Sequence, residues 1–503
     1  MTVRRFPIAS RIWLLALALT LAATVGRHLR HNRDSVRPVI LGWDNGHYFA
    51  WARSVAVDGD ADFDNDFRFL AAMPGGGENA QAFAQIFARG DRTPAGRPPN
   101  KYGIGLGLLA MPLVFVARGA VAAYEGVSGV EVSRFAAIYN VAFIAASVML
   151  AYAGLAVAFR VLALRFGRRP AGMAVAAVAL GTPLGHYIWF APTMAHAAAF
   201  ACTTAAVAVA LWWREALDRG AAPGLVAWRA ALAGAACGFA ATVRYPCMVI
   251  ALVPAAFGLS HLLAGLCPAG RRVAAVGVSL AAGLAGAALG FLPQLIAWKC
   301  VYGSWVVYSY AGVSLSPWPV HGLKVLFSPR VGLFYWTPLA LLAVGGLVWA
   351  VVAARERLLA AAMLLVLGAT LWVYGGWEDW GLGSTFGMRG FVDVSLCFMV
   401  GVAFLGSRAA HAPVRARVLT GLLAVLAVGN IWLMLAYKAG VIPAAGPLDV
   451  RQVLSQPGKI LRKARGELRF ERHLFGRKFP LFTPADTLPG DDPELAVRRP
   501  SAP

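Results

Sequence analysis

Long apolar stretches separated by short basic loops dominate the pattern of this 503-residue chain. A helix needs about 20 apolar residues to cross the hydrocarbon layer of a bilayer. The stretches that meet or approach this length, and that we expect to be transmembrane helices, are 9–26, 135–159, 171–190, 193–213, 228–243, 247–266, 273–297, 331–353, 358–375, 390–407 and 418–436. The pattern therefore predicts an all-α polytopic membrane protein with about 11 transmembrane helices.

The apolar run 103–117, between Lys101 and Arg118, is shorter than the others. At 1.5 Å per residue it extends about 22 Å, which is less than the roughly 30 Å of a hydrocarbon core. We therefore predict a helix that lies in or near the membrane interface. The segment 27–134 then forms one long first outer loop that bears interfacial helices.

The distribution of arginine supports this topology. If 103–117 does not cross, the short arginine-rich loops all fall on the side of Arg4 and Arg5, as the positive-inside rule requires. This predicts a cytoplasmic N-terminus, a membrane domain over 1–436, and a basic C-terminal tail, 437–503, on the outer side. We expect the first helix to be retained, although a cleaved signal peptide is the alternative. The Ala/Arg/Gly-rich composition suggests a bacterium with a GC-rich genome, so the expected location is a bacterial inner membrane.

Composition narrows the function classes. The chain is 59% hydrophobic and only 14% charged, with a mean hydropathy of +0.63, which excludes a soluble enzyme. The net charge of +22 reflects membrane orientation, and no nucleic-acid-binding motif accompanies it, so we expect membrane lipids and no nucleic acid as partners. The six cysteines lie almost wholly in apolar runs and are typical of buried small residues rather than of a disulfide framework.

Polar chemistry concentrates in two aromatic and acidic segments on the predicted outer side. The first directly follows the first apolar helix and contains Trp43-Asp44-Asn45-Gly46-His47-Tyr48. The second is Trp377-Glu378-Asp379-Trp380, in the last large outer turn. Aromatic faces beside carboxylates suit a polar ligand with apolar faces, and a sugar is one such ligand.

The order of these and other motifs resembles the GT-C superfamily of integral-membrane glycosyltransferases, in particular protein O-mannosyltransferases and aminoarabinose transferases. Besides the Asp44 segment, the motifs that carry the resemblance are Asn100-Lys101-Tyr102-Gly103, Gly181-Thr182-Pro183, Pro192-Thr193-Met194-Ala195-His196, Thr242-Val243-Arg244-Tyr245-Pro246, Ser328-Pro329-Arg330-Val331-Gly332 and Ser384-Thr385-Phe386-Gly387-Met388-Arg389. Close relatives often have Asp-Glu at the first motif, whereas this chain has Asp44-Asn45 and thus a single carboxylate there.

The resemblance implies transfer of a sugar from a polyprenyl-phosphate donor to an acceptor hydroxyl on the periplasmic or extracellular side, with inversion. A carboxylate must take the hydroxyl proton and cations must stabilise the leaving phosphate. We assign Asp44 as the catalytic base. The candidates for the donor phosphate are Arg244, Arg389, Lys101 and Arg330, and those for the sugar or acceptor are His47, Tyr48, Tyr102, His196, Trp377, Glu378 and Asp379. The acceptor is a glycan, a lipid or a protein.

Each of these residues also has a structural interpretation. Asp44 could be a helix cap or a solvated loop acid. Arg389 stands four residues before Asp393, the spacing of an ion pair on one helix face. Arg330 could extend to lipid head groups. Glu378 and Asp379 are either solvated loop acids or an alternative base, and the histidines could be satisfied interface residues.

Alternating carboxylates at Asp58, Asp60, Asp62, Asp64 and Asp66 suggest a weak metal alternative, since hard oxygens bind calcium, magnesium or manganese. The spacing lacks the glycine and terminal glutamate of an EF-hand loop. We expect no required cofactor, because a polyprenyl monophosphate leaving group needs a divalent ion less than a diphosphate does.

Two functions outside glycosyl transfer remain alternatives. A transporter or flippase of a lipid-linked saccharide should carry ionisable residues near the bilayer midplane, whereas here they gather at the predicted outer helix ends. A non-catalytic GT-C-like scaffold is favoured by the missing second acid beside Asp44.

Overall fold

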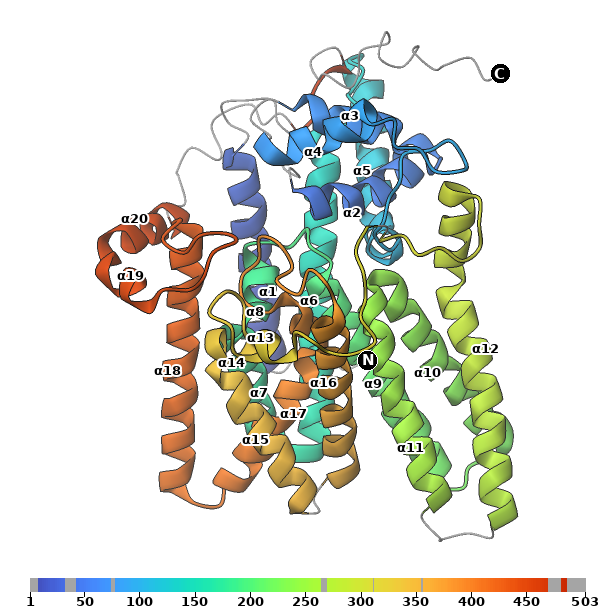
Figure 1. Cartoon of the computed structure of the whole chain (residues 1–503), viewed down its shortest axis with the longest axis vertical. Coiled ribbons are helices and arrows are strands. Elements are labelled where there is room, and N and C mark those ends of the chain that lie inside the picture. Colours follow the sequence, from blue (N-terminus) through green and yellow to red (C-terminus); the bar gives the residue numbers. More distant parts are fainter. Residues whose placement is uncertain are drawn as a thin grey trace, which may run out of the picture.

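The computed structural model describes residues 8–31, 42–73, 77–263, 269–310, 312–353, 356–468 and 481–485. Within these ranges the regular structure is helical, and β-pairing is limited to two isolated bridges. Figure 1 shows a bundle of long upright helices with a layer of shorter helices above it. The predicted all-α polytopic fold is confirmed.

Nine helical segments of the described ranges are long and apolar enough to cross a membrane. They are α5 (Gly105–Ser128), α6 (Ala137–Phe166), α9 (His196–Asp218), α10 (Pro223–Val243), η2 with α11 (Tyr245–Leu263), Arg272–Tyr302 of α12 (Ala269–Tyr302), α16 (Arg357–Gly376), η3 with α17 (Arg389–Ala409) and α18 (Pro413–Lys438). A tenth span results if α7 (Arg168–Gly181) and α8 (Pro183–Trp189), which are bent by 75°, are counted as one.

The described parts of the eleven predicted ranges lie mainly in helices, although the range 171–190 consists of the two helices α7 and α8, and residues 264–266 of the range 247–266 lie outside the described residues. The range 9–26 lies within α1 (Ile8–His31). The range 331–353 divides into α14 (Leu333–Trp336) and α15 (Pro338–Val352). The division falls at Thr337 because proline at the start of α15 has no N–H to continue the preceding helix.

The helix predicted over 103–117 is longer than its apolar run, and our estimate of its length was wrong. α5 continues past Arg118, which donates a hydrogen bond to the carbonyl oxygen of Ala56 at 2.8 Å, and ends where Gly129 adopts φ 65°. By length and composition α5 could therefore cross a membrane. It begins beside the last turn of α10, since a Cβ atom on Gly105 would lie 2.4 Å from Oγ1 of Thr242. From there it runs upward above the ends of α12 and α18 (Figure 1).

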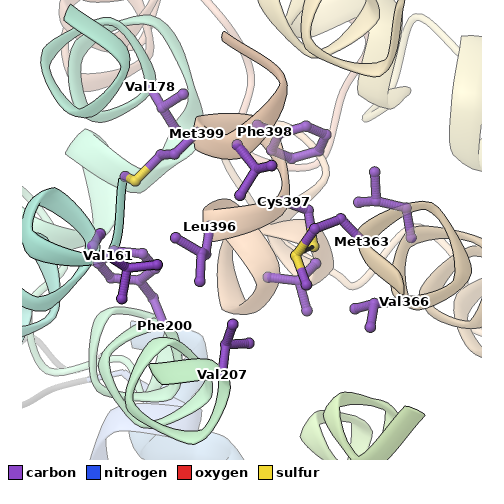
Figure 2. Close-up of a cluster of buried hydrophobic side chains, with 14 of the residues drawn as sticks. Val161, Val178, Phe200, Val207, Met363, Val366, Leu396, Cys397, Phe398 and Met399 are labelled. Carbon is purple, nitrogen blue, oxygen red and sulfur yellow. Dashed lines mark hydrogen bonds between the residues drawn. The ribbon is translucent and has the colours of Figure 1, made fainter. Parts of the chain in front are cut away.

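The centre of the bundle is α17 (Ser395–Ala409), which is almost entirely buried. Figure 2 shows its side chains surrounded by those of α6, α7, α9 and α16, with the labelled residues Val161, Val178, Phe200, Val207, Met363, Val366, Leu396, Cys397, Phe398 and Met399. The 3-10 helix η3 (Arg389–Val394) continues directly into α17. The packed centre therefore fixes the segment that carries Arg389 and Asp393.

The predicted first outer loop folds into short helices, namely α2 (Trp43–Arg53), the π-helical η1 (Ser54–Asp58), α3 (Asp64–Ala72) and α4 (Gly77–Ala88). Figure 1 shows them above the bundle. The fully buried Arg53 holds them together, with Nη2 2.7 Å from Oδ2 of Asp66 and Nη1 3.2 Å from Oδ1 of Asp58. Buried aromatic rings, including Trp51 and Phe63 at 4.7 Å, fill the space between these helices.

The described parts of the C-terminal tail pack against the rest of the chain. After α18 it forms α19 (Val450–Ser455) and α20 (Pro457–Leu468). The described segment 481–485 lies against the end of the first outer loop, where the backbone N–H of Ser133 donates to the carbonyl of Thr483 at 2.8 Å and the rings of Tyr124 and Phe482 stack at 4.4 Å. The tail and the end of the first outer loop are therefore on the same side of the molecule.

Candidate active site

Asp44 lies in the first turn of α2, after the N-cap residue Gly42. Its carboxylate turns towards two partners from distant parts of the chain. The hydroxyl of Tyr102 donates a hydrogen bond to Oδ1, and Nη2 of Arg389 lies 3.1 Å from Oδ2. The Asp44 side chain keeps 20% of its surface exposed, so it is neither a solvated loop acid nor sealed in the interior.

The surroundings of Asp44 decide its protonation state. Burial raises the pKa of the carboxyl, but Arg389, the hydrogen bond from Tyr102 and the charge of Lys101 outweigh burial and lower the pKa below its ordinary value of 3.8. The carboxylate is therefore ionised at neutral pH, which is the form that a general base requires.

A second ion-paired group surrounds Arg244, between α10 and η2 (Tyr245–Ala251). Nη1 of Arg244 lies 3.0 Å from Oδ2 of Asp393, and the nearby His196 places Nδ1 2.9 Å from Oδ1 of the same carboxylate. Arg244 has an extended backbone (φ −151°, ψ 127°), because Pro246 cannot donate the backbone hydrogen bond of a continued helix. The exit from the helix directs Arg244 towards η3.

The ion pair that the spacing of Arg389 and Asp393 suggested is not among the contacts of the described residues. Both residues lie in η3, a 3-10 helix with three residues per turn. Side chains four residues apart in such a helix point about 120° away from each other. Consequently Arg389 pairs with Asp44 and Asp393 pairs with Arg244, so that this one short helix joins both polar groups.

Tyrosines lie beside both groups. Nη2 of Arg244 lies 3.4 Å from the hydroxyl of Tyr374, and the hydroxyls of Tyr187 and Thr385 are 3.0 Å apart. Tyr374 packs directly on η3 at Gly390, where a Cβ atom would lie 2.3 Å from the Tyr374 ring. A glycine at this position therefore lets the tyrosine approach the arginine.

Lys101 stands on the Asp44 side of the site. Its Nζ lies 5.3 Å from the ring centres of both Tyr102 and Tyr310, and burial lowers the pKa of its ammonium group. The ring of Tyr102 packs in turn on that of Tyr48 at 4.9 Å. The structure thus brings together Asp44, Lys101, Tyr48, Tyr102 and Arg389.

Other predicted site residues have different surroundings. His47 is buried among aromatic rings, with Nδ1 2.8 Å from the carbonyl oxygen of Trp43, and burial lowers its pKa to about 4, so the ring is neutral. This agrees better with a packing role than with a ligand contact. Arg330 lies over the ring of Trp380, with 6.0 Å from Cζ to the ring centre. It makes no contact with Asp44 or Arg389 among the described residues.

The segment after α16 lies at the edge of the site. The ring of Trp377 is 5.2 Å from that of Tyr310, which links it to Lys101. Asp379 acts on the pKa of Lys101 through its charge. Glu378 points to solvent and accepts hydrogen bonds from the backbone N–H and hydroxyl of Ser314, both at 2.9 Å, which lower its pKa. In the structure Glu378 thus stabilises the loop at Ser314, and its role at the acceptor stays a prediction.

The acidic run that suggested a metal site is occupied by internal partners. Asp58 and Asp66 pair with Arg53, Asp60 accepts from the hydroxyl of Ser54 at 2.7 Å, and Asp64 pairs with Arg92 at 2.7 Å. The part of the chain that the structure describes holds no group of three or more His, Cys, Asp or Glu side chains arranged to bind a metal ion. These carboxylates stabilise the layer of short helices α2, η1, α3 and α4, which we call the outer helical layer.

Sequence reasoning considered Asp393 only as a possible ion-pair partner of Arg389 and assigned no role to Tyr374 or Tyr310. Asp393 had a usable signal, because it is an acid near the start of the apolar run 390–407, and an ionisable residue within a membrane helix usually has a specific partner. The two tyrosines gave none, since aromatic residues at the ends of membrane helices are common.

Comparisons with known proteins concern the fold. No protein-family model and no curated protein matches the sequence. A solved structure of the archaeal oligosaccharyltransferase AglB from Archaeoglobus fulgidus, in complex with an inhibitory peptide and a dolichol-phosphate, is similar with a TM-score of 0.48 and 12% identity, covering 88% of this chain and 57% of that one. The oligosaccharyltransferase of the same organism in complex with Zn and sulfate has a TM-score of 0.49 and 14% identity, covering 87% and 54%.

The apo form of that enzyme has a TM-score of 0.47 and 13% identity, covering 87% of this chain and 57% of the other. This chain therefore spans somewhat more than half the length of these proteins. At such identities the similarity concerns the arrangement of helices and not the chemistry of the site.

Proposed function

We propose that this protein is a membrane glycosyltransferase of the GT-C type, which transfers a sugar from a polyprenyl-phosphate donor to an acceptor hydroxyl. The observation that carries the proposal is the position of the Asp44 carboxylate, which pairs with Arg389 and lies within the electrostatic influence of Lys101. A carboxylate that can take a proton, next to cations that can stabilise a phosphate, supplies the two functions that such a transfer requires.

In the proposed reaction the acceptor oxygen attacks the anomeric carbon while Asp44 takes the hydroxyl proton. The bond between the anomeric carbon and the phosphate oxygen breaks, and its electron pair stays on the departing polyprenyl phosphate. A single displacement inverts the configuration at that carbon. Asp44 then releases the proton to water.

The donor phosphate is proposed to bind between Arg389, Lys101 and Arg244. Nε of Arg389 is buried and has no hydrogen-bond partner among the described residues, so one donor of this guanidinium is available for a ligand. Asp393 and His196 hold the guanidinium of Arg244 in place. The role of Arg330 at the phosphate stays a prediction from the resemblance.

Aromatic side chains around Asp44 suit the sugar and the acceptor. We propose contacts with Tyr48, Tyr102 and Trp377, whose rings form a continuous series through Tyr310. The acceptor is a hydroxyl of a glycan, a lipid or a protein. A divalent ion is not required in this proposal, so a chelator should leave transfer unchanged.

The proposed location is a bacterial inner membrane, with the N-terminus in the cytoplasm and the site and C-terminal tail on the periplasmic side. The arginine-rich loops at the opposite end of the bundle from Asp44, including Arg165 and Arg214, support this orientation. Accessibility of single cysteines to a membrane-impermeant maleimide in intact cells tests it.

Transfer assays with purified protein test the function. The protein in lipid vesicles is given a panel of polyprenyl-phosphate donors with labelled sugars, together with membrane extracts as acceptors. We expect label to pass to an acceptor with inversion. Label that crosses the bilayer while still attached to its polyprenyl phosphate would instead identify a flippase, and neither transfer nor movement would favour a scaffold.

A further inference from the structure

The segment after α18 forms a helical hairpin that the proposed reaction does not use. It consists of α19 and α20, joined at Gln456. Figure 1 shows the hairpin beside the upper end of α18, projecting sideways from the bundle. Its position gives it a face that the rest of the described chain does not cover.

The inward face fixes the hairpin to the bundle. Val453 of α19 and Ile460 of α20 are 2% and 0% exposed. They belong to a hydrophobic cluster that includes Met434 of α18 and Val441 and Ile442 of the following turn. The side chain of Asp449 caps α19 by accepting the backbone N–H of Arg451 at 2.9 Å. The hairpin is therefore an ordered part of the fold.

The outward face combines apolar and basic side chains. Val450, Leu454 and Leu461 are 48%, 69% and 47% exposed. Residues 449–468 include five Lys or Arg and only two acids, and Arg451 and Arg462 are both exposed. An apolar strip flanked by cations is typical of a helix that lies in the interface of an anionic membrane.

The neighbouring helix shows where the membrane surface is. α18 meets the length and composition of a membrane span, and its outward residues Val418, Val425 and Val428 are 65%, 68% and 66% exposed, as expected of a lipid-facing side. The span ends at Lys438, and the hairpin starts eleven residues later at Asp449–Val450. The apolar strip of the hairpin thus lies next to the end of a lipid-facing surface.

We propose that α19 and α20 form an interfacial anchor that lies on the membrane surface beside α18 and binds the head groups of anionic phospholipids. Leu454 and Leu461 enter the boundary between head groups and acyl chains, while Arg451 and Arg462 pair with phosphate groups. Basic residues near an anionic surface attract its lipids, and buried apolar side chains hold the helix in the interface. This surface is separate from the proposed catalytic site.

Retention of anionic lipid tests the charge contribution. The full chain is purified from membranes that contain phosphatidylcholine and phosphatidylglycerol, and the phosphatidylglycerol that remains bound is measured by mass spectrometry. We expect Arg462→Glu to lower retention about fivefold, which corresponds to ~1 kcal/mol for a basic side chain at the surface. Arg89→Glu, the same charge change at an exposed position of the outer loop, should leave it unchanged. Equal retention by both variants would overturn the proposal.

The depth of the apolar strip is an independent test that does not depend on lipid type. A nitroxide is attached to a single cysteine in Leu454→Cys, Val425→Cys or Ser455→Cys. The native cysteines are first replaced, and the cysteine-free protein is required to keep the thermal stability of the wild type. In vesicles, the oxygen accessibility of the label at 454 should be close to that of the label at 425, which faces lipid. The label at 455 should instead be accessible to a water-soluble nickel complex. A label at 454 that only the nickel complex reaches, or that couples to a second copy, would contradict membrane contact.

Discussion

Nη2 of Arg389 lies 3.1 Å from Oδ2 of Asp44, although the two residues are 345 positions apart in the sequence. The pair joins the first turn of α2, above the bundle, to η3 at the head of the buried helix α17. The guanidinium keeps a largely buried carboxylate ionised, and in the proposed reaction it also faces the leaving phosphate.

Removing the charge of Arg389 should change the pH dependence of transfer. Burial raises the pKa of Asp44, and the charge of Arg389 lowers it. Arg389→Gln removes that charge, so the pKa of Asp44 should rise. A base with a raised pKa stays protonated up to a higher pH. The acidic limb of the profile of kcat/KM against pH should therefore move to higher pH. Arg389→Lys, which keeps the charge, should move it less, and an unmoved limb in Arg389→Gln would contradict this explanation.

The buried pair of Arg244 and Asp393 should behave as a unit. Both Arg244→Met and Asp393→Asn leave one partner without its counterpart, and breaking a buried ion pair costs about 3–5 kcal/mol. The double variant should be destabilised by less than the sum of the two single variants. Thermal unfolding in detergent measures the difference. Strictly additive losses would show that the two side chains do not interact.

Lys101 should contribute to donor binding. A hydrogen bond or ion pair to a charged phosphate is worth ~1.5–3 kcal/mol, so Lys101→Ala should weaken binding of a polyprenyl-phosphate sugar by about tenfold or more. Lys299→Ala is the matched control, because Lys299 is an exposed lysine that donates to the carbonyl of Gly303 at the end of α12. Equilibrium binding of a fluorescent donor distinguishes the two, and equal affinities would place the phosphate away from Lys101.

The outer helical layer should lose stability as the pH rises. Burial raises the pKa of Asp66 from 3.8 to about 6 despite the opposing effect of Arg53, so the folded state binds this proton more tightly than the unfolded state does. The free energy of unfolding therefore falls as the pH increases from 3.8 through about 6. Limited proteolysis of α3 and α4 across this range measures the effect. In Asp66→Asn the contribution should disappear, and an unchanged pH dependence in that variant would assign it to another group.

The helices were predictable because each needs only a local property, an apolar stretch of sufficient length. The prediction was wrong where a local property was misleading. The predicted apolar run of α5 stops at Arg118, but the helix continues to Ser128, and the arginine side chain reaches the carbonyl of Ala56. That contact depends on tertiary structure, which the sequence pattern does not express.

In the candidate site, too, the sequence identified residues but not their tertiary contacts. Its motifs gave Asp44, Lys101, Arg244 and Arg389 as residues, but not their pairing. The spacing of Arg389 and Asp393 indicates an ion pair only if the segment is an α-helix, and η3 is a 3-10 helix instead. The partners of both arginines are consequently set by where the tertiary structure places η3 relative to Asp44 and Arg244, which sequence spacing cannot show.

The most direct test of the proposed reaction compares wild type with Asp44→Asn in the transfer assay, together with donor binding and thermal unfolding of both proteins. The substitution keeps the shape of the side chain and removes its ability to take the proton. We expect Asp44→Asn to remain folded and to bind donor, with transfer reduced by about 10²–10⁴-fold. Transfer at the wild-type rate by this variant would contradict the assignment of Asp44 as the base.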